Sequence, residues 1–319
     1  MAFYNQRADK GQAFFDALSE VLKTPIPITG RENVTISVSA GESRYPESAK
    51  NSIELINCAE IVLEQQKKSA PGSIYFFEAP VLDDLMHNIA LESDLKQAID
   101  EHSFELYYQP QYDALTKKLR GVEALIRWKN EEGYYISPSK FIPLAERGGL
   151  IGPIGKWVLE EALRAYSNWM RNFNYPIVLS VNISAIQFKR EDFIPSLFEL
   201  IDKYEVNPAF LELEITESVL IDDLDAVLSS MHVIRERGIK MSLDDFGTGY
   251  SSLSYLKNLP IDTLKIDKSF IDTVIDDNST RIITESIISM VKKLGFETVA
   301  EGVENKHDNI PRTLRYGCG

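Results

Sequence analysis

Two adjacent aspartates, Asp244 and Asp245, stand between a short predicted strand and a glycine-containing loop in the segment MSLDDFGTGYSS at residues 241–252. Residues 240–243 alternate polar and apolar side chains, which is typical of a strand that faces two environments. Carboxylates at such a strand end can hold separate metal ions or share one. Taken alone, the segment is better explained as a polar turn, because Asp and Gly are common turn residues.

Repetition favours a site over a turn, because several other predicted strands also end in an acid or an amide. Carboxylate and amide oxygens without histidine or thiolate select hard ions such as Mg²⁺ or Mn²⁺. Two such ions about 4 Å apart can activate water and stabilise the leaving oxygen of a phosphodiester, and a nearby lysine can orient that water or neutralise charge on the phosphate. The residues are Glu123, Asn182, Glu214, Asp244, Asp245, Lys265, Asp267, Glu301 and Glu304.

Each of these residues also has an ordinary structural explanation. Glu123 fits a charge on a strand surface, Asn182 fits a helix cap, Lys265 fits a solvated lysine, and Glu301 fits the start of a turn. One at a time, those explanations are favoured. Such residues at the same end of six strands of one sheet are hard to obtain by chance, so we expect a site there.

The elements that must position these residues alternate along the chain. The first two strands are separated by about nine residues, too few for a parallel crossover, so they should form an antiparallel hairpin. The later alternation of helix and strand predicts right-handed βαβ units, a parallel sheet and an α/β barrel whose site lies at the strand C-terminal ends. The predicted strands are 104–109, 119–127, 177–183, 210–216, 240–244, 262–267 and 297–301, and the helices are 155–172, 191–204, 222–237 and 279–294.

The N-terminal part reads as a separate small α+β piece. Helices are predicted at 12–22 and 52–67, and strands at 33–38 and 73–77. Pro80 marks a boundary, after which residues 82–101 have the spacing of a connecting helix. The predicted organisation is therefore a first domain at 1–79, a connecting helix at 80–103 and a barrel domain at 104–319.

Composition excludes several classes of protein. The chain has 319 residues, 44% of them hydrophobic, and a net charge of −14, which disfavours a nucleic-acid polymer or an anionic membrane as partner. Two cysteines, Cys58 and Cys318, form no metal or disulfide pattern and fit a reducing cytosol. The four histidines share no ligand spacing, and there is no signal peptide and no run of about 18 apolar residues. We therefore expect a cytoplasmic protein.

The order of the acidic motifs resembles the EAL family of cyclic-di-GMP phosphodiesterases, from about residue 95 to residue 303. Its domains convert the cyclic dinucleotide to 5′-pGpG with two Mg²⁺ or Mn²⁺ ions, and their (β/α)8-type barrel has an antiparallel first strand, as the hairpin predicts. The motifs are EAL at 123–125 followed by Arg-Trp at 127–128, EITE at 214–217, DDFG at 244–247, KID at 265–267 and AEGVE at 300–304.

The resemblance implies roles for the matched acids. One ion would be held by Glu123, Asn182, Glu214 and Asp244. The second would be held by Asp244 and Asp245, with Glu301 close by as ligand or general base.

It also implies roles around the metal centre. Lys265 would position the attacking water, and Gln109, Leu125 and Arg127 would contact the substrate, with Arg127 on phosphate. Glu217 resembles a glutamate that braces the DDFG loop near the family's dimer interface, which implies a homodimer through the barrel.

Both ends of the chain resemble the edges of a fragment of a longer GGDEF-EAL protein. Residues 1–79 resemble the C-terminal half of a GGDEF domain, on ISVSAG at 36–41, Tyr45-Pro46 and NCAE at 57–60, but the signature motif is absent and no cyclase activity is expected. After Glu304 the family's eighth strand, with its Gln-Gly-Tyr, and the closing helix are not matched. We therefore expect a poorly closed barrel and a parent protein that could be membrane-tethered.

Two functions follow. The intact set of acids favours a metal-dependent cyclic-di-GMP phosphodiesterase. The unmatched eighth strand favours a regulatory module that binds cyclic-di-GMP or a partner without turnover.

Overall fold

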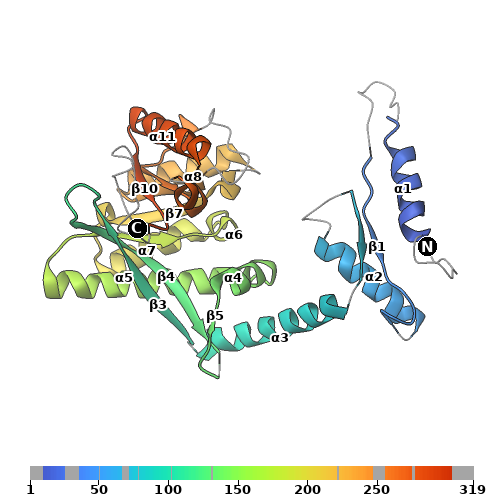
Figure 1. The fold of residues 1–319 in the computed structure, drawn as a ribbon. Coiled ribbons are helices and arrows are strands. Elements are labelled where there is room, and N and C mark those ends of the chain that lie inside the picture. Colours follow the sequence, from blue (N-terminus) through green and yellow to red (C-terminus); the bar gives the residue numbers. More distant parts are fainter. Residues whose placement is uncertain are drawn as a thin grey trace. The chain divides into compact units, whose positions relative to one another are not determined.

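The computed structural model describes residues 10–25, 36–49, 51–66, 72–77, 79–101, 103–130, 132–220, 223–246, 256–274 and 277–303. The chain divides into two compact units, Met1–Leu91 and Glu92–Gly319 (Figure 1). The boundary falls within helix α3 (Ala79–Glu101). Among the helices in these ranges, none is long and apolar enough to cross a membrane.

The first unit contains helices α1 (Lys10–Leu22) and α2 (Ser52–Gln66) and a parallel pair of strands, β1 (Ala40–Glu42) and β2 (Ile74–Phe76). The helices and the second strand were predicted, but the strand expected at 33–38 is wrong in its described part, because residues 36–39 are not in a strand. The reason is the packing of β1 on α2. A side chain at Gly41 would lie 1.9 Å from the Ala59 carbonyl oxygen, so only glycine allows this close approach.

A single sheet organises the second unit, in the order β10-β9-β8-β7-β6-β4-β3, with β5 paired to β4. The hairpin β3–β4 is antiparallel, as predicted, and β4, β6, β7, β8, β9 and β10 pair in parallel (Figure 1). The strands are β3 (Phe104–Tyr112), β4 (Leu119–Lys129), β5 (Tyr135–Ile136), β6 (Val178–Asn182), β7 (Leu211–Thr216), β8 (Lys240–Phe246), β9 (Thr263–Ile266) and β10 (Glu297–Ala300).

Helices connect the parallel strands. The long helices α5, α7, α8 and α11 were predicted, since each carries an apolar stripe; in α5, for example, Leu159, Leu163 and Tyr166 are buried. The short elements α4, α6, α10 and β5 were not predicted, because they are too short to show a clear periodicity. The helices are α4 (Pro138–Arg147), α5 (Ile151–Phe173), α6 (Ala185–Phe188), α7 (Phe193–Tyr204), α8 (Leu224–Glu236), α10 (Lys268–Thr273) and α11 (Asn278–Lys293).

The sheet is curled into part of a barrel. In a flat sheet β4 and β9 would lie about 19 Å apart, four strand spacings of about 4.8 Å. Yet Lys265 Nζ on β9 lies 3.2 Å from Glu123 Oε2 on β4. The predicted barrel-type α/β fold is therefore confirmed. Within the described residues β3 and β10 are the two edges of the sheet. The residues from 304 onward, on which the expectation of an unmatched eighth strand rests, lie outside the described ranges.

Candidate functional site

The side chain of Lys265 lies at the centre of a cluster of four buried or half-buried carboxylates, contributed by β4, β7, β8 and the residue after β10. The Nζ atom lies 3.2 Å from Glu123 Oε2, 2.6 Å from Glu214 Oε2, 3.0 Å from Asp244 Oδ2 and 2.7 Å from Glu301 Oε1. Lys265 is only 2% exposed. Residues far apart in the sequence are thus brought together by the curl of the sheet.

Strand register explains this convergence. Asn182 at the end of β6 pairs with Glu214 on β7, and its Nδ2 donates a hydrogen bond of 2.7 Å to Glu123 Oε1. On the other side, the Glu301 backbone N–H donates to the Ile266 carbonyl at 3.1 Å, which extends the β10–β9 pairing by one residue. Inward-facing positions at the C-terminal ends of parallel strands therefore meet around one point.

Negative charge exceeds positive charge in this cluster. Burial raises the pKa of Glu214 well above its ordinary value, despite the neighbouring lysine. Burial likewise raises the pKa of Glu301 to about 7, with Lys265 opposing the rise and Asp244 adding to it. Burial would lower the pKa of Lys265, but the surrounding carboxylates outweigh it and raise that pKa. One ammonium therefore does not balance all the acids.

The cluster has the chemistry of a divalent-cation site. Glu214 Oε1 is buried and has no hydrogen-bond partner among the residues that the structure describes, although a buried carboxylate oxygen normally has one. The donors are carboxylate oxygens together with the Asn182 amide, a set that suits Mg²⁺ or Mn²⁺. In the described part of the chain, no three acidic, histidine or cysteine side chains are spaced to hold an ion as they stand. The reason is that the carboxylates close on the Lys265 ammonium, so ion binding requires a rearrangement of side chains.

The paired aspartates occupy different environments. Asp244 is buried and contacts Lys265, whereas Asp245 is exposed. The Asp245 backbone has a φ of 55°, and the β8–β9 register shifts between Leu243 and Phe246. Such irregularities re-aim a side chain, and aspartate tolerates the left-handed conformation better than most residues. Although its side chain reaches solvent, desolvation by the surrounding protein and then the charges of Asp244 and Asp267 raise the pKa of Asp245.

The predicted substrate-contacting residues lie on one face of the β3–β4 hairpin. Gln109 pairs with Glu123 across the two strands, and Leu125 and Arg127 follow Glu123 at alternate positions of β4. Alternate strand residues share a face, so all four project to the side of the acid cluster. The Arg127 guanidinium lies over the Tyr107 ring, 5.5 Å from its centroid.

Two further predicted residues, Asp267 and Glu217, lie in elements next to the strand ends, and a third, Glu304, cannot be placed. Asp267 caps α10, because its Oδ1 accepts from the Ser269 backbone N–H at 3.0 Å. Glu217 begins a short 3₁₀ helix, Glu217–Leu220, and its charge contributes to the raised pKa of Asp245. Glu304 lies outside the described residues.

The sequence analysis did not predict a second buried ionic group. This group lies one inward-facing position before the acid cluster, nearer the N-terminal ends of the strands. Arg120 Nη2 lies 3.1 Å from Glu212 Oε2, and Glu212 is fully buried. Glu212 precedes Glu214 by two residues, so the acids at alternate positions of LELE (211–214) could have indicated two buried layers. The other partners of this pair are Gln111, Ser180, Thr263 and Glu297.

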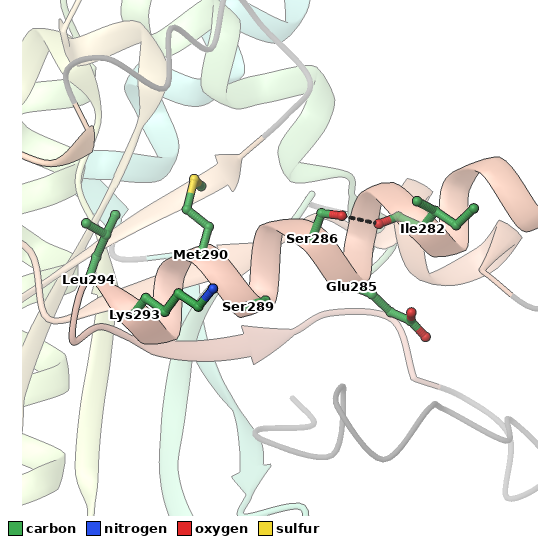
Figure 2. A pocket seen from close by; sticks show the side chains of 7 residues that line it. All are labelled: Ile282, Glu285, Ser286, Ser289, Met290, Lys293 and Leu294. Carbon is green, nitrogen blue, oxygen red and sulfur yellow. Dashed lines mark hydrogen bonds between the residues drawn. The ribbon is translucent and has the colours of Figure 1, made fainter.

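A hollow also runs along one side of α11 (Figure 2). It contains none of the predicted site residues, so the acid cluster is the better candidate for chemistry. Its lining residues are Ile282, Glu285, Ser286, Ser289, Met290, Lys293 and Leu294.

Comparisons with known proteins match this part of the chain. The EAL domain model matches residues 92–309. The signaling protein YkoW of Bacillus subtilis is 38% identical over 283 residues, which cover 89% of this chain and 35% of YkoW. The bifunctional diguanylate cyclase/cyclic di-GMP phosphodiesterase MucR of Pseudomonas aeruginosa is 37% identical over 288 residues, which cover 90% of this chain and 42% of MucR. The chain thus spans less than half of either relative.

A solved structure also shares this fold. The solved structure of the PaMucR phosphodiesterase in complex with c-di-GMP superposes with a TM-score of 0.69 at 38% identity, covering 72% of this chain and 94% of that one.

Proposed function

The chain belongs to the EAL domain family, and we propose that it hydrolyses cyclic-di-GMP to 5′-pGpG in bacterial second-messenger signalling, with the help of divalent metal ions. The observation that carries the proposal is the group of four carboxylates around Lys265, at the strand ends where barrel enzymes place their sites. The similarity to MucR, a bifunctional diguanylate cyclase/cyclic di-GMP phosphodiesterase, supports the choice of reaction.

The acid cluster would hold two Mg²⁺ or Mn²⁺ ions. Glu123, Asn182, Glu214 and Asp244 would bind one ion, and Asp244 with Asp245 would bind the other. Bound ions of this kind supply a polarised water and neutralise charge on the phosphate. The buried Oε1 of Glu214, which has no partner within the described ranges, supports the assignment, because a cation would satisfy it.

The protein's own residues would handle the proton and the water. Glu301 would accept the proton of the attacking water, and its pKa of about 7 in the metal-free protein, which suits a base near neutrality, supports this role. Lys265 would orient that water and neutralise charge that develops on the phosphate. The water oxygen forms the new bond to phosphorus, one P–O3′ bond breaks, and the 3′ oxygen leaves with a proton. The ring is thereby opened to 5′-pGpG.

Substrate would lie on the hairpin face next to the cluster. Arg127 would grip a phosphate with its planar fork of donors, and Gln109 and Leu125 would contact the rest of the dinucleotide. Their common face with Glu123 in the β3–β4 register supports this placement.

One observation favours a regulatory module that binds cyclic-di-GMP without turnover. In the described part of the chain, the acidic side chains are not spaced to hold an ion as they stand, because they close on the Lys265 ammonium. Under this alternative the acid cluster binds nucleotide and metal but does not align them for reaction.

We also propose the domain organisation of the chain, on the basis of the sequence motifs described above. Residues 1–79 would be the remnant of a GGDEF domain, 80–103 a connecting helix, and 104–319 the EAL domain. A homodimer through the EAL barrel and a cytoplasmic location would complete the assignment. The two cysteines without a disulfide pattern support that location.

The test is an assay of purified protein with cyclic-di-GMP and Mn²⁺ or Mg²⁺, with product separated by chromatography. Metal-dependent formation of 5′-pGpG, abolished by chelator, supports the phosphodiesterase. Tight binding with no product supports the regulatory module instead. Neither binding nor product would refute both.

A further inference from the structure

A row of exposed side chains continues from the acid cluster along the β3–β4 hairpin. Tyr107 pairs with Leu125, one alternate position beyond the pair of Gln109 and Glu123. Side chains of paired strand residues lie on the same face, so Tyr107 lies beside two of the proposed substrate contacts, Leu125 and Arg127. The other face of β4 is occupied by the protein core, for example by Trp128, which is 1% exposed.

Tyr107 forms a fixed pair with Tyr135 of β5. The ring centroids are 5.9 Å apart at an interplanar angle of 76°, and the two hydroxyl oxygens are 2.5 Å apart. Tyr135 also donates to Glu105 Oε2 at 3.2 Å, and Lys129 Nζ lies 2.9 Å from Glu105 Oε1. These contacts orient both rings before any ligand arrives, so little conformational entropy remains to be lost on binding.

The rings remain accessible although they are held in place. Tyr107 and Tyr135 are each 48% exposed to solvent, so part of each side chain can contact a ligand. The Arg127 guanidinium covers part of the Tyr107 ring at 5.5 Å, and its Nη1 donates to the Ile126 carbonyl at 2.9 Å. An oriented aromatic ring next to a guanidinium is the combination with which proteins bind a nucleotide, the base by stacking and the phosphate by charge.

We propose that Tyr107, held in position by Tyr135, is the stacking surface for one guanine base of the dinucleotide. The proposal rests on the proposed function, since it assumes that a phosphate of the substrate lies at Arg127 and the acid cluster. In a nucleotide the base is one sugar ring away from its phosphate, and Tyr107 lies next to Arg127 on the same face. Stacking requires only a π-face, so this contact selects nucleotides over simple phosphodiesters without distinguishing the bases.

The experiment measures equilibrium binding of cyclic-di-GMP by isothermal titration, in the presence of Mg²⁺. All proteins carry Glu301→Gln to suppress turnover. Tyr107→Leu should weaken binding about 5- to 150-fold, the loss of one base–aromatic stack, whereas Tyr107→Phe and Tyr107→Trp, which keep a ring, should bind within about threefold of the parent. Tyr112→Leu is the matched control, because Tyr112 lies on the same strand, is similarly exposed at 44%, and is far from the tyrosine pair.

The outcomes separate the stacking proposal from the proposed function. If the Tyr107→Leu and Tyr112→Leu proteins bind alike, or if Tyr107→Trp weakens binding as much as Tyr107→Leu, Tyr107 only braces the hairpin and the stacking proposal is wrong. If the parent protein binds no cyclic-di-GMP at all, the proposed function fails and the stacking proposal fails with it. Thermal unfolding of each variant verifies the fold, and the ring-retaining variants give the answer should Tyr107→Leu not fold.

Discussion

Replacing Lys265 by methionine should make the stability of the second unit depend on divalent cations. Methionine keeps most of the volume of the side chain but removes the ammonium that contacts Glu123, Glu214, Asp244 and Glu301 at 2.6–3.2 Å. Lys265 is 2% exposed, so water cannot easily replace the lost contacts. Removing one partner of a buried ion pair costs about 3–5 kcal/mol, a large part of the ~5–15 kcal/mol that stabilises a domain.

The assay is thermal unfolding of Lys265→Met and wild type, each with EDTA and with Mn²⁺. With EDTA, the variant should melt roughly 6–20 °C below wild type, since 1 kcal/mol shifts Tm by about 2–4 °C in a unit of this size. Added Mn²⁺ should raise the Tm of the variant more than that of wild type, because the ion binds the folded state and replaces the missing cation.

A surface lysine provides the control. Lys203→Met removes an ion pair of 2.6 Å to Glu160, but both side chains are solvent-exposed, so the Tm should change little. If Lys203→Met and Lys265→Met lower the Tm equally in EDTA, or if Mn²⁺ stabilises wild type and Lys265→Met by the same amount, Lys265 is not the cation that holds the acid cluster together.

Three other predictions concern Glu301 and Arg127. Glu301→Gln should lower 5′-pGpG formation at least ~10²-fold while titration shows cyclic-di-GMP binding better preserved; wild-type turnover with unchanged metal content would exclude the assignment. Arg127→Lys should weaken cyclic-di-GMP binding without changing metal binding, because lysine lacks the planar fork; equal affinity in calorimetry would make Arg127 an ordinary surface charge. The metal-free protein should lose up to about 3 kcal/mol of stability as pH rises from about 4.5 to 7, because the folded pKa of Glu301 is raised to about 7. This contribution is fully present below the unfolded pKa and is lost as pH rises to the folded pKa. In Glu301→Gln the free energy of unfolding from chemical denaturation should depend less on pH across that range.

The acid cluster was predictable because its residues end strands that the hydrophobic pattern identifies. Glu214 lies near the end of a strand with alternating apolar residues and Asp244 ends another predicted strand, and the rule that barrel sites lie at the C-terminal ends of strands then brings them together. The central position of Lys265 was not predictable. It depends on how far the sheet curls between β4 and β9, and no local pattern in the sequence encodes that curvature.

Features that depend on pairing between distant segments were missed for the same reason. Tyr107 and Tyr135 meet only because β5 pairs with the end of β4, and a strand of two residues has no detectable period. The prediction of a strand at 33–38 is wrong in its described part. Close packing at Gly41, rather than the apolar run before it, fixes the position of β1.

Replacing Glu214 and Glu212 separately by glutamine gives the most direct measurement of the acid cluster as the reaction centre. Both side chains are fully or almost fully buried on β7, two residues apart, but only Glu214 contacts Lys265, whereas Glu212 contacts Arg120. The rate of 5′-pGpG formation, normalised to folded protein, is measured with saturating Mn²⁺. We expect Glu214→Gln to lose at least ~10²-fold, several kcal/mol of transition-state stabilisation, and Glu212→Gln to remain close to wild type. Equal rates in the two variants, or wild-type turnover in Glu214→Gln, would contradict a reaction at this cluster.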